Sequence, residues 1–90
     1  MKLTETHKSM ILHALGSPKP KALKTTPLDE FFRNHYMLYE DSDGVVECDE
    51  MVTAGFMRKR KYPYAENGII YHVTQSGLDA LKESSDAPKS

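Results

Sequence analysis

Ninety residues with a net charge of −1, of which 39% are hydrophobic and 28% charged, are typical of one globular domain with a modest core. A core of that size leaves little room for a deep active-site pocket, so we expect no small-molecule substrate. The single cysteine, Cys48, excludes an intrachain disulfide, and no apolar run approaches the roughly 18 residues of a membrane span. We therefore expect a soluble, cytoplasmic protein without a membrane partner.

Charged residues are segregated along the chain. Residues 39–57 contain acidic residues but no lysine or arginine, and residues 58–64 contain lysine and arginine but no acidic residue. Such blocks create local surfaces of one sign, and they say more about partners than the net charge does.

The first predicted helix spans residues 3–15, where apolar residues recur at three- and four-residue spacing. Thr4 suits its N-cap, and Gly16 suits its C-terminal end. His7 falls on the apolar stripe, and we interpret it as a half-buried structural histidine. The next segment, residues 17–27, is rich in Pro, Lys and Thr and predicts an exposed loop.

A short second helix is predicted to follow this loop. Thr26 suits its N-cap and Pro27 its first position, and the helix should end near His35. Residues 36–39 fit either its last turn or a short strand, because four residues are too few for periodicity to decide. The apolar residues of this predicted helix are Leu28, Phe31 and Phe32.

The pattern then predicts a third helix and a β-hairpin. The helix spans residues 45–54 and has Cys48 on its inner side. Residues 56–62 and 69–73 predict two strands, joined by a turn at Asn67-Gly68, because both of these residues tolerate positive φ.

A last helix is predicted over residues 75–83, with Thr74 as its cap. We expect a single domain over residues 1–84 and a disordered tail over residues 85–90.

Two segments resemble the junctions of winged helix-turn-helix domains. Residues 51–58, M-V-T-A-G-F-M-R, are similar to the pattern L-V-x-x-G-L-I-x-R, in which the third helix ends on a glycine and enters the wing. Residues 71–78, Y-H-V-T-Q-S-G-L, are similar to Y-x-L-T-x-x-G-x, in which the wing leads into the next helix. The resemblance implies an α+β, winged-helix-like fold of three helices, a two-stranded β-hairpin (the wing) and a C-terminal helix. It places Tyr71 and Val73 in the core and Thr74 at a helix cap.

The linker between the second and third helices departs from that family. Residues 35–44 separate the two helices, whereas the family has a turn of a few residues. This departure argues against standard docking of the third helix in a major groove.

Residues 3–82 also resemble small proteins encoded by bacteriophages and prophages. The shared patterns are the L-T start at 3–4, I-L-H-A-L-G at 11–16, R-N-H-Y at 33–36, the segment 48–57 and the exit at 71–77. This resemblance implies a location in a bacterial host cell, and it transfers no activity.

The basic run is the first candidate for nucleic-acid binding. It consists of Arg58, Lys59, Arg60 and Lys61, followed by Tyr62 and Tyr64. On a wing, such residues reach phosphates or a minor groove. The alternative is a solvated strand whose positive charges discourage aggregation through its edge.

Arg33 and Asn34 are a second candidate, because Arg and Asn match the edges of guanine and adenine. The alternative is a helix end with a basic residue and a structural asparagine.

The third helix carries the acidic residues Glu47, Asp49 and Glu50, which would repel phosphates. An acidic helix beside a basic wing instead suits a protein partner. Self-association through the hairpin or the first helix is compatible with either reading.

We expect no enzymatic activity, no cofactor and no metal site. The chain has no phosphate-cradling glycine loop and no nucleophile elbow, and its histidines lack companions at metal-ligand spacing. Cys48 lies near carboxylates and apolar groups, so its pKa should not fall and it is a poor nucleophile. The sequence therefore predicts a DNA-binding regulator that uses the basic wing. The alternative is a protein-interaction module, such as a host-protein modulator or adaptor, that uses the acidic helix and does not bind DNA.

Overall fold

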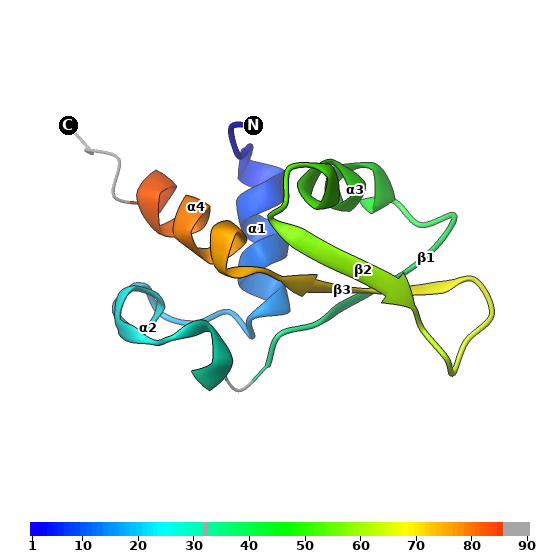
Figure 1. The fold of residues 1–90 in the computed structure, drawn as a ribbon, viewed down its shortest axis with the longest axis horizontal. Helices are drawn as coiled ribbons and strands as arrows, with labels where there is room; N and C mark the ends of the chain where they lie inside the picture. The colour runs from blue at the N-terminus through cyan, green and yellow to red at the C-terminus, as the bar shows by residue number, and fades with distance from the viewer. Residues whose placement is uncertain (32, 86–90) are drawn as a thin grey trace.

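The described part of the chain, residues 1–31 and 33–85 of the computed structural model, consists of helices and one antiparallel sheet (Figure 1). The helices are α1 (Glu5–Ala14), α2 (Pro20–Thr25), α3 (Val45–Thr53) and α4 (Gln75–Ser85), with a 3-10 turn, η1 (Leu28–Glu30), after α2. The strands are β1 (Tyr36–Tyr39), β2 (Met57–Lys61) and β3 (Gly68–Val73), in the order β1-β3-β2. The expected α+β class is confirmed, and the sheet has a third strand beside the predicted hairpin.

The predicted first helix and its cap are confirmed. The hydroxyl of Thr4 accepts a hydrogen bond from the backbone N–H of His7 (3.2 Å), and the Thr4 N–H donates to Nδ1 of the His7 ring (2.9 Å). This reciprocal pair is a capping box, with an imidazole in the role that Glu or Gln usually has. The His7 ring is buried, and its Nε2 lies 3.0 Å from Oε1 of Glu50 in α3. Because Nδ1 accepts, Nε2 carries the proton and donates to Glu50.

The predictions for residues 17–35 are partly wrong. Residues 20–25 form α2 instead of loop, because Pro20 suits the first position of a helix and Leu23 is buried in the core. The helix ends at Thr26, where a residue that precedes proline is disfavoured from helical geometry. The predicted second helix is reduced to η1, since Phe31 is extended at ψ 138°. Phe32 lies outside the described residues.

Residues 36–39 form a strand, which decides between the two alternatives for this segment. Tyr36 is paired with Tyr71 and Met37 with Ile70 in an antiparallel ladder. Only residues 40–44 separate β1 from α3, so no described helix directly precedes α3. The predicted linker of residues 35–44 therefore contains the third strand of the sheet.

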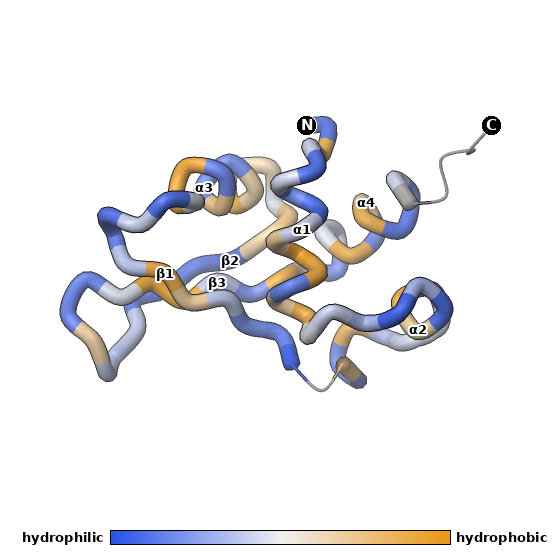
Figure 2. Tube along the Cα trace, turned by 180° about the vertical axis from the view of Figure 1, so that it is seen from behind, coloured by the Kyte–Doolittle hydropathy of each residue, from blue (hydrophilic) through white to orange (hydrophobic). Residues whose placement is uncertain are grey.

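One side of the sheet packs on α1 and α3, and α4 packs on α1, to form a single core. The expected core positions Tyr71 and Val73 are both buried. Figure 2 shows hydrophobic and hydrophilic stretches alternating along α1, α3 and α4, as expected for helices with one buried side. The largest fully buried side chains of this core are Ile11, Leu15, Cys48, Met51, Met57, Tyr71, Val73, Leu78 and Leu81.

The two motif segments meet where α3 ends and α4 begins. Thr74 donates its backbone N–H to the carbonyl of Phe56 (3.0 Å) and its hydroxyl to the carbonyl of Gly55 (2.7 Å). The same hydroxyl accepts from the N–H of Gly77 (3.1 Å), which confirms the predicted cap of the last helix. Gly55 has a positive φ of 84°, which ends α3. Helix α4 continues to Ser85, and the rest of the predicted tail lies outside the described residues.

Gly77 generates a stability prediction. Replacing a helical glycine by alanine usually stabilises a helix by about 1 kcal/mol. A Cβ at Gly77 would overlap the backbone carbonyl oxygen of Phe56, which cannot rotate away. We therefore expect Gly77→Ala to lower the free energy of unfolding by about 2 kcal/mol or more, measured by urea denaturation. The neighbouring exposed Ser76→Ala is the control, and it should change stability by less than about 0.5 kcal/mol. Equal effects of the two variants would contradict this account.

Candidate nucleic-acid interface

The sheet has one side covered by helices and one side open. Tyr71 and Val73 of β3 are buried in the core, so the alternation of a strand directs Ile70 and His72 to the opposite side. The register extends this assignment to β2, because Arg58 is paired with His72 and Arg60 with Ile70. The predicted basic run is therefore divided between the two sides of the sheet.

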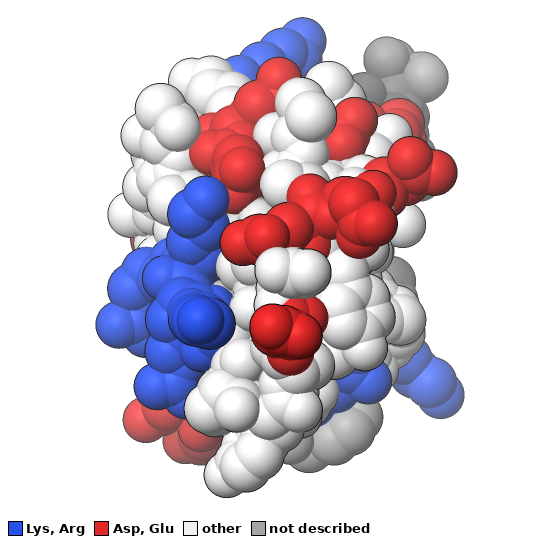
Figure 3. All heavy atoms as spheres, turned by 90° about the vertical axis from the view of Figure 1, so that its right-hand side faces the viewer, with Lys and Arg blue, Asp and Glu red and all other residues white. Residues whose placement is uncertain are grey.

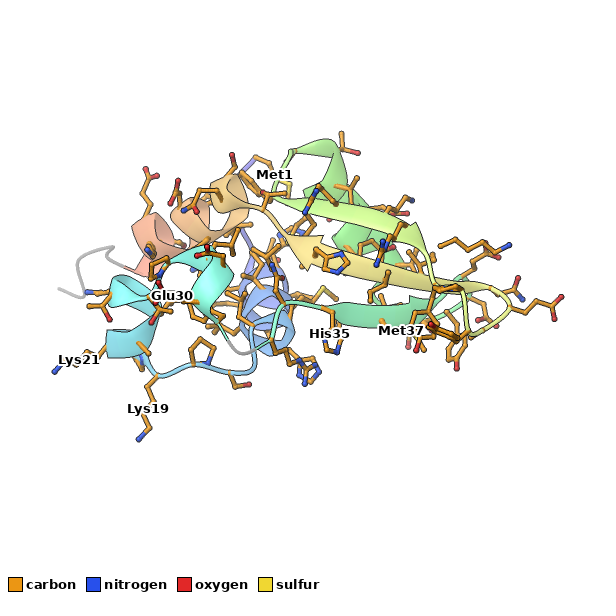
Figure 4. The ribbon with its side chains drawn as sticks, turned by 60° about the horizontal axis from the view of Figure 1, so that its bottom comes forward. Met1, Lys19, Lys21, Glu30, His35 and Met37 are labelled. Atoms are coloured by element: carbon orange, nitrogen blue, oxygen red, sulfur yellow. The ribbon has the colours of Figure 1, made fainter. Side chains whose placement is uncertain are left out.

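Strand β1 completes the open side. Met37 is paired with Ile70, and Tyr39 is paired with Gly68. Figure 4 looks onto this side, with Met37 labelled on β1, His35 labelled just before that strand, and no described helix in front of the three strands. We call this side the open face; its strand residues are Met37, Tyr39, Arg58, Arg60, Ile70 and His72.

Lys59 belongs to the other side of the sheet and has a structural partner. Its ammonium lies 2.9 Å from Oδ1 of Asp49 in α3, and the same oxygen accepts a hydrogen bond from the hydroxyl of Tyr71 (2.9 Å). The hydrogen bond from Lys59 is the largest of the effects that lower the pKa of Asp49, and the Tyr71 hydroxyl adds to it. Burial, followed by the hydrogen bond to Asp49, raises the pKa of Tyr71. Lys59 and Tyr71 thus both link Asp49 of α3 to the sheet.

Arg58, Arg60 and Lys61 are exposed and make no ion pair with any residue in the described ranges. β2 is also an edge strand, so these side chains border solvent along its whole length. His72, between the two arginines and β1, has a pKa lowered by burial and then by the positive charges of Arg60 and Arg58. Arg58 and Arg60 therefore place positive charge beside His72 on the open face.

Tyr62 and Tyr64 lie in the hairpin that continues β2. Their rings form an edge-to-face pair with centroids 5.5 Å apart, and Tyr64 is 85% exposed. The predicted Asn67-Gly68 turn is present, with Asn67 at a positive φ of 62°. The aromatic pair therefore borders the basic strand, as the sequence suggested.

Asn34 has a structural role. Its amide nitrogen donates to the carbonyl of Val73 (3.0 Å), and its amide oxygen accepts from the N–H of Val73 (2.8 Å). This pair extends the pairing between β1 and β3, and it favours the alternative of a structural asparagine. Nε of the neighbouring Arg33 is shielded from solvent without a hydrogen-bond acceptor among the described atoms. Neither residue is part of the open face as defined above.

Two of the three acidic residues of α3 are engaged within the fold. Asp49 is bound by Lys59 and Tyr71, and Glu50 by His7. Glu47 has no hydrogen bond or ion pair among the residues that the structure describes. Figure 3 shows the acidic side chains beside a compact basic patch, so the charge blocks of the sequence become adjacent surfaces. A protein partner at α3 would compete with contacts that hold the helix in place.

Several residues of the open face were not identified from the sequence. Alternation within residues 69–73 would have separated Ile70 and His72 from the buried positions. Met37 and Tyr39 offered no such signal, because they join the face only through the pairing of β1 with β3.

The thiol of Cys48 is buried, and burial, with Asp49 and Glu47 nearby, raises its pKa to about 12. The expectation that its pKa does not fall is confirmed. Within residues 1–31 and 33–85, no three His, Cys, Asp or Glu side chains are grouped to hold a metal ion. None of the helices in these ranges is long and apolar enough to span a membrane.

Comparisons of the chain with protein-family models, with curated proteins and with solved structures gave no match.

Asp49 generates a prediction about stability and pH. Asp49→Ala leaves the buried hydroxyl of Tyr71 without its acceptor, and we expect a loss of about 1–3 kcal/mol in the free energy of unfolding. The control Tyr71→Phe removes the hydroxyl itself, leaves Lys59 bound to Asp49, and should cost less.

The pKa of Asp49 is lowered in the folded state, so its contribution is complete above the unfolded pKa of about 3.9 and is lost as the pH falls through the lowered value. Urea denaturation at a series of pH values should show the difference between wild type and Asp49→Ala shrinking below about pH 4. A difference that is constant down to pH 2 would rule out this contribution of the carboxylate.

His72 provides a second prediction. Its NMR-detected titration should have a midpoint below the ordinary value of 6.5. In Arg58→Gln/Arg60→Gln the midpoint should rise, because two nearby positive charges are removed, and should stay below 6.5, because burial persists. Lys19→Gln/Lys21→Gln, at the N-cap and in the first turn of α2, is the matched control. An unchanged midpoint in the arginine variant would show that the arginines do not act on this face.

Proposed function

We propose that this protein is a non-enzymatic DNA-binding module, with a regulatory role, that contacts phosphates through β2. The observation that supports it best is a set of exposed cations on an edge strand that form no ion pair within residues 1–31 and 33–85, of which Arg58 and Arg60 lie on the open face. Positive charge without internal partners is available to replace the counterions around a phosphate backbone. Lys61 is exposed on the same strand but on the side of Lys59, and Lys59 would have to be shared with Asp49.

The hairpin then acts as the wing of a winged-helix-like arrangement. A strand, a helix that ends on Gly55 and then a hairpin follow one another as β1, α3, β2 and β3, and this order supports the assignment, although α2 and η1 stand between α1 and β1. The absence of a described helix between β1 and α3, together with the acidic residues of α3, argues that α3 is not inserted in a major groove. Contact through the wing keeps those carboxylates away from the phosphates.

A protein partner on α3 is the less supported alternative. It would use Glu47, Asp49 and Glu50, but Asp49 and Glu50 hold α3 to the sheet and to α1. The cations of β2 have no comparable role, apart from Lys59. This asymmetry favours the basic strand as the functional surface.

Binding to a labelled mixed-sequence duplex, followed by fluorescence anisotropy, tests the proposal. With two to four phosphate contacts, the affinity should fall about tenfold to hundredfold between about 50 mM and 200 mM salt. Arg58→Glu/Arg60→Glu should weaken binding by at least about tenfold at the lower salt and make the salt dependence less steep.

The control is Lys19→Glu/Lys21→Glu, which makes the same change in net charge on α2. Figure 4 shows Lys19 and Lys21 at the end of the molecule opposite Met37. This control should bind like the wild type. Equal weakening by both double variants would indicate a response to net charge alone, and unchanged binding by the arginine variant would refute the assignment of β2.

A further inference from the structure

Two tyrosines flank a glycine at the hairpin end of the open face, and a third tyrosine contacts one of them. Tyr39 is paired with Gly68 across β1 and β3, and on the other side the backbone N–H of Tyr62 donates to the carbonyl of Gly68 (2.9 Å). A Cβ at Gly68 would lie 3.1 Å from the Cβ of Tyr62, so Tyr62 is on the same side of the sheet as that vector. Tyr64 contacts the ring of Tyr62 at its edge.

Aromatic rings beside a glycine in a sheet cover its backbone, and this structural role accounts for part of the arrangement. It does not account for the exposure of the rings, because Tyr39 is 47% and Tyr64 85% exposed. Exposed tyrosine rings next to cations are a surface on which planar, uncharged groups can stack. The arrangement therefore suits a ligand as well as a structural role.

The rest of the open face has the same combination of apolar and basic groups. Met37 and Ile70 are half-buried at its centre, and no described helix covers them (Figure 4). Arg58 and Arg60 run along one border, and no strand position of this face carries an acidic residue. The ligand that complements it has flat apolar groups on one side and negative charges along the other.

We propose that the open face binds single-stranded DNA, with unpaired bases on the tyrosine rings and phosphates along Arg58 and Arg60. This inference rests on the proposed function and names the form of DNA that the same site prefers. Base-on-ring stacking requires unpaired bases, because pairing and stacking within a duplex hide the base faces. Duplex DNA would use only the arginines, whereas a single strand would use both parts of the face.

Anisotropy titrations with a labelled oligothymidine of about 12 nucleotides, and with a mixed-sequence duplex of similar length, separate the two parts. Wild-type protein should bind the single strand more tightly than the duplex at low salt. Tyr39→Ala/Tyr64→Ala should weaken single-strand binding by about tenfold or more and leave duplex binding within about twofold. Arg58→Glu/Arg60→Glu should weaken binding to both.

The matched control is Tyr39→Phe/Tyr64→Phe, which keeps the rings and removes the hydroxyls, and it should bind the single strand like the wild type. Tyr64→Ala alone, at the 85% exposed position, tests stacking where substitution disturbs the fold least. Circular dichroism establishes that each variant is folded.

Three results would overturn the inference. If the alanine variants bind the single strand normally while the arginine variant loses both DNA forms, the rings are not a platform and the proposed function still stands. Tighter binding of the duplex than of the single strand would have the same meaning. If neither form binds at low salt, the proposed function fails as well.

Discussion

The contact between Thr74 and the Gly55–Phe56 turn is the constraint on which the rest of the structure depends. Thr74 bonds both carbonyls of that turn and caps α4, and Gly77 lets the helix backbone approach Phe56. The end of α3 is thereby held against the start of α4. This junction therefore sets the direction in which the β2–β3 hairpin leaves the helices. That direction determines which side of the sheet faces the helices and which side faces solvent.

The alternation of β2 gives its four cations different physical roles. Lys59, on the side of the helices, neutralises Asp49 and fixes α3 to the sheet. Arg58 and Arg60, on the open face, keep their charge available and shift the titration of His72 instead. A run that reads as one basic patch in the sequence thus contributes both to stability and to a charged surface. The acidic helix shows the converse, because most of its charge is used to hold the fold.

Local signals predicted much of this fold, and pairings between distant segments explain what was missed. Caps, glycines and periodicity located α1, α3, α4 and the hairpin within a few residues. They failed in part for residues 17–35 and left residues 36–39 undecided, since α2 is stabilised by burial of Leu23 and β1 by pairing with β3. The basic run and the tyrosines of the candidate site were visible in the sequence. Met37, Tyr39 and the structural use of Asn34 were not, because each depends on a partner more than 25 residues away.

The ring of His7 serves the start of α1 and the packing of that helix at the same time. One nitrogen accepts from the backbone of Thr4, and the other donates to Glu50, 43 residues along the chain. When α3 is not docked, Glu50 does not lie beside His7, and the ring is bonded only to Thr4. The first turn of α1 then lacks the hydrogen bond to Glu50 that helps to orient the ring in the capping box. Short isolated helices are marginal in water. Formation of α1 and docking of α3 are therefore coupled events, and the two helices should gain and lose order together as the protein folds and unfolds.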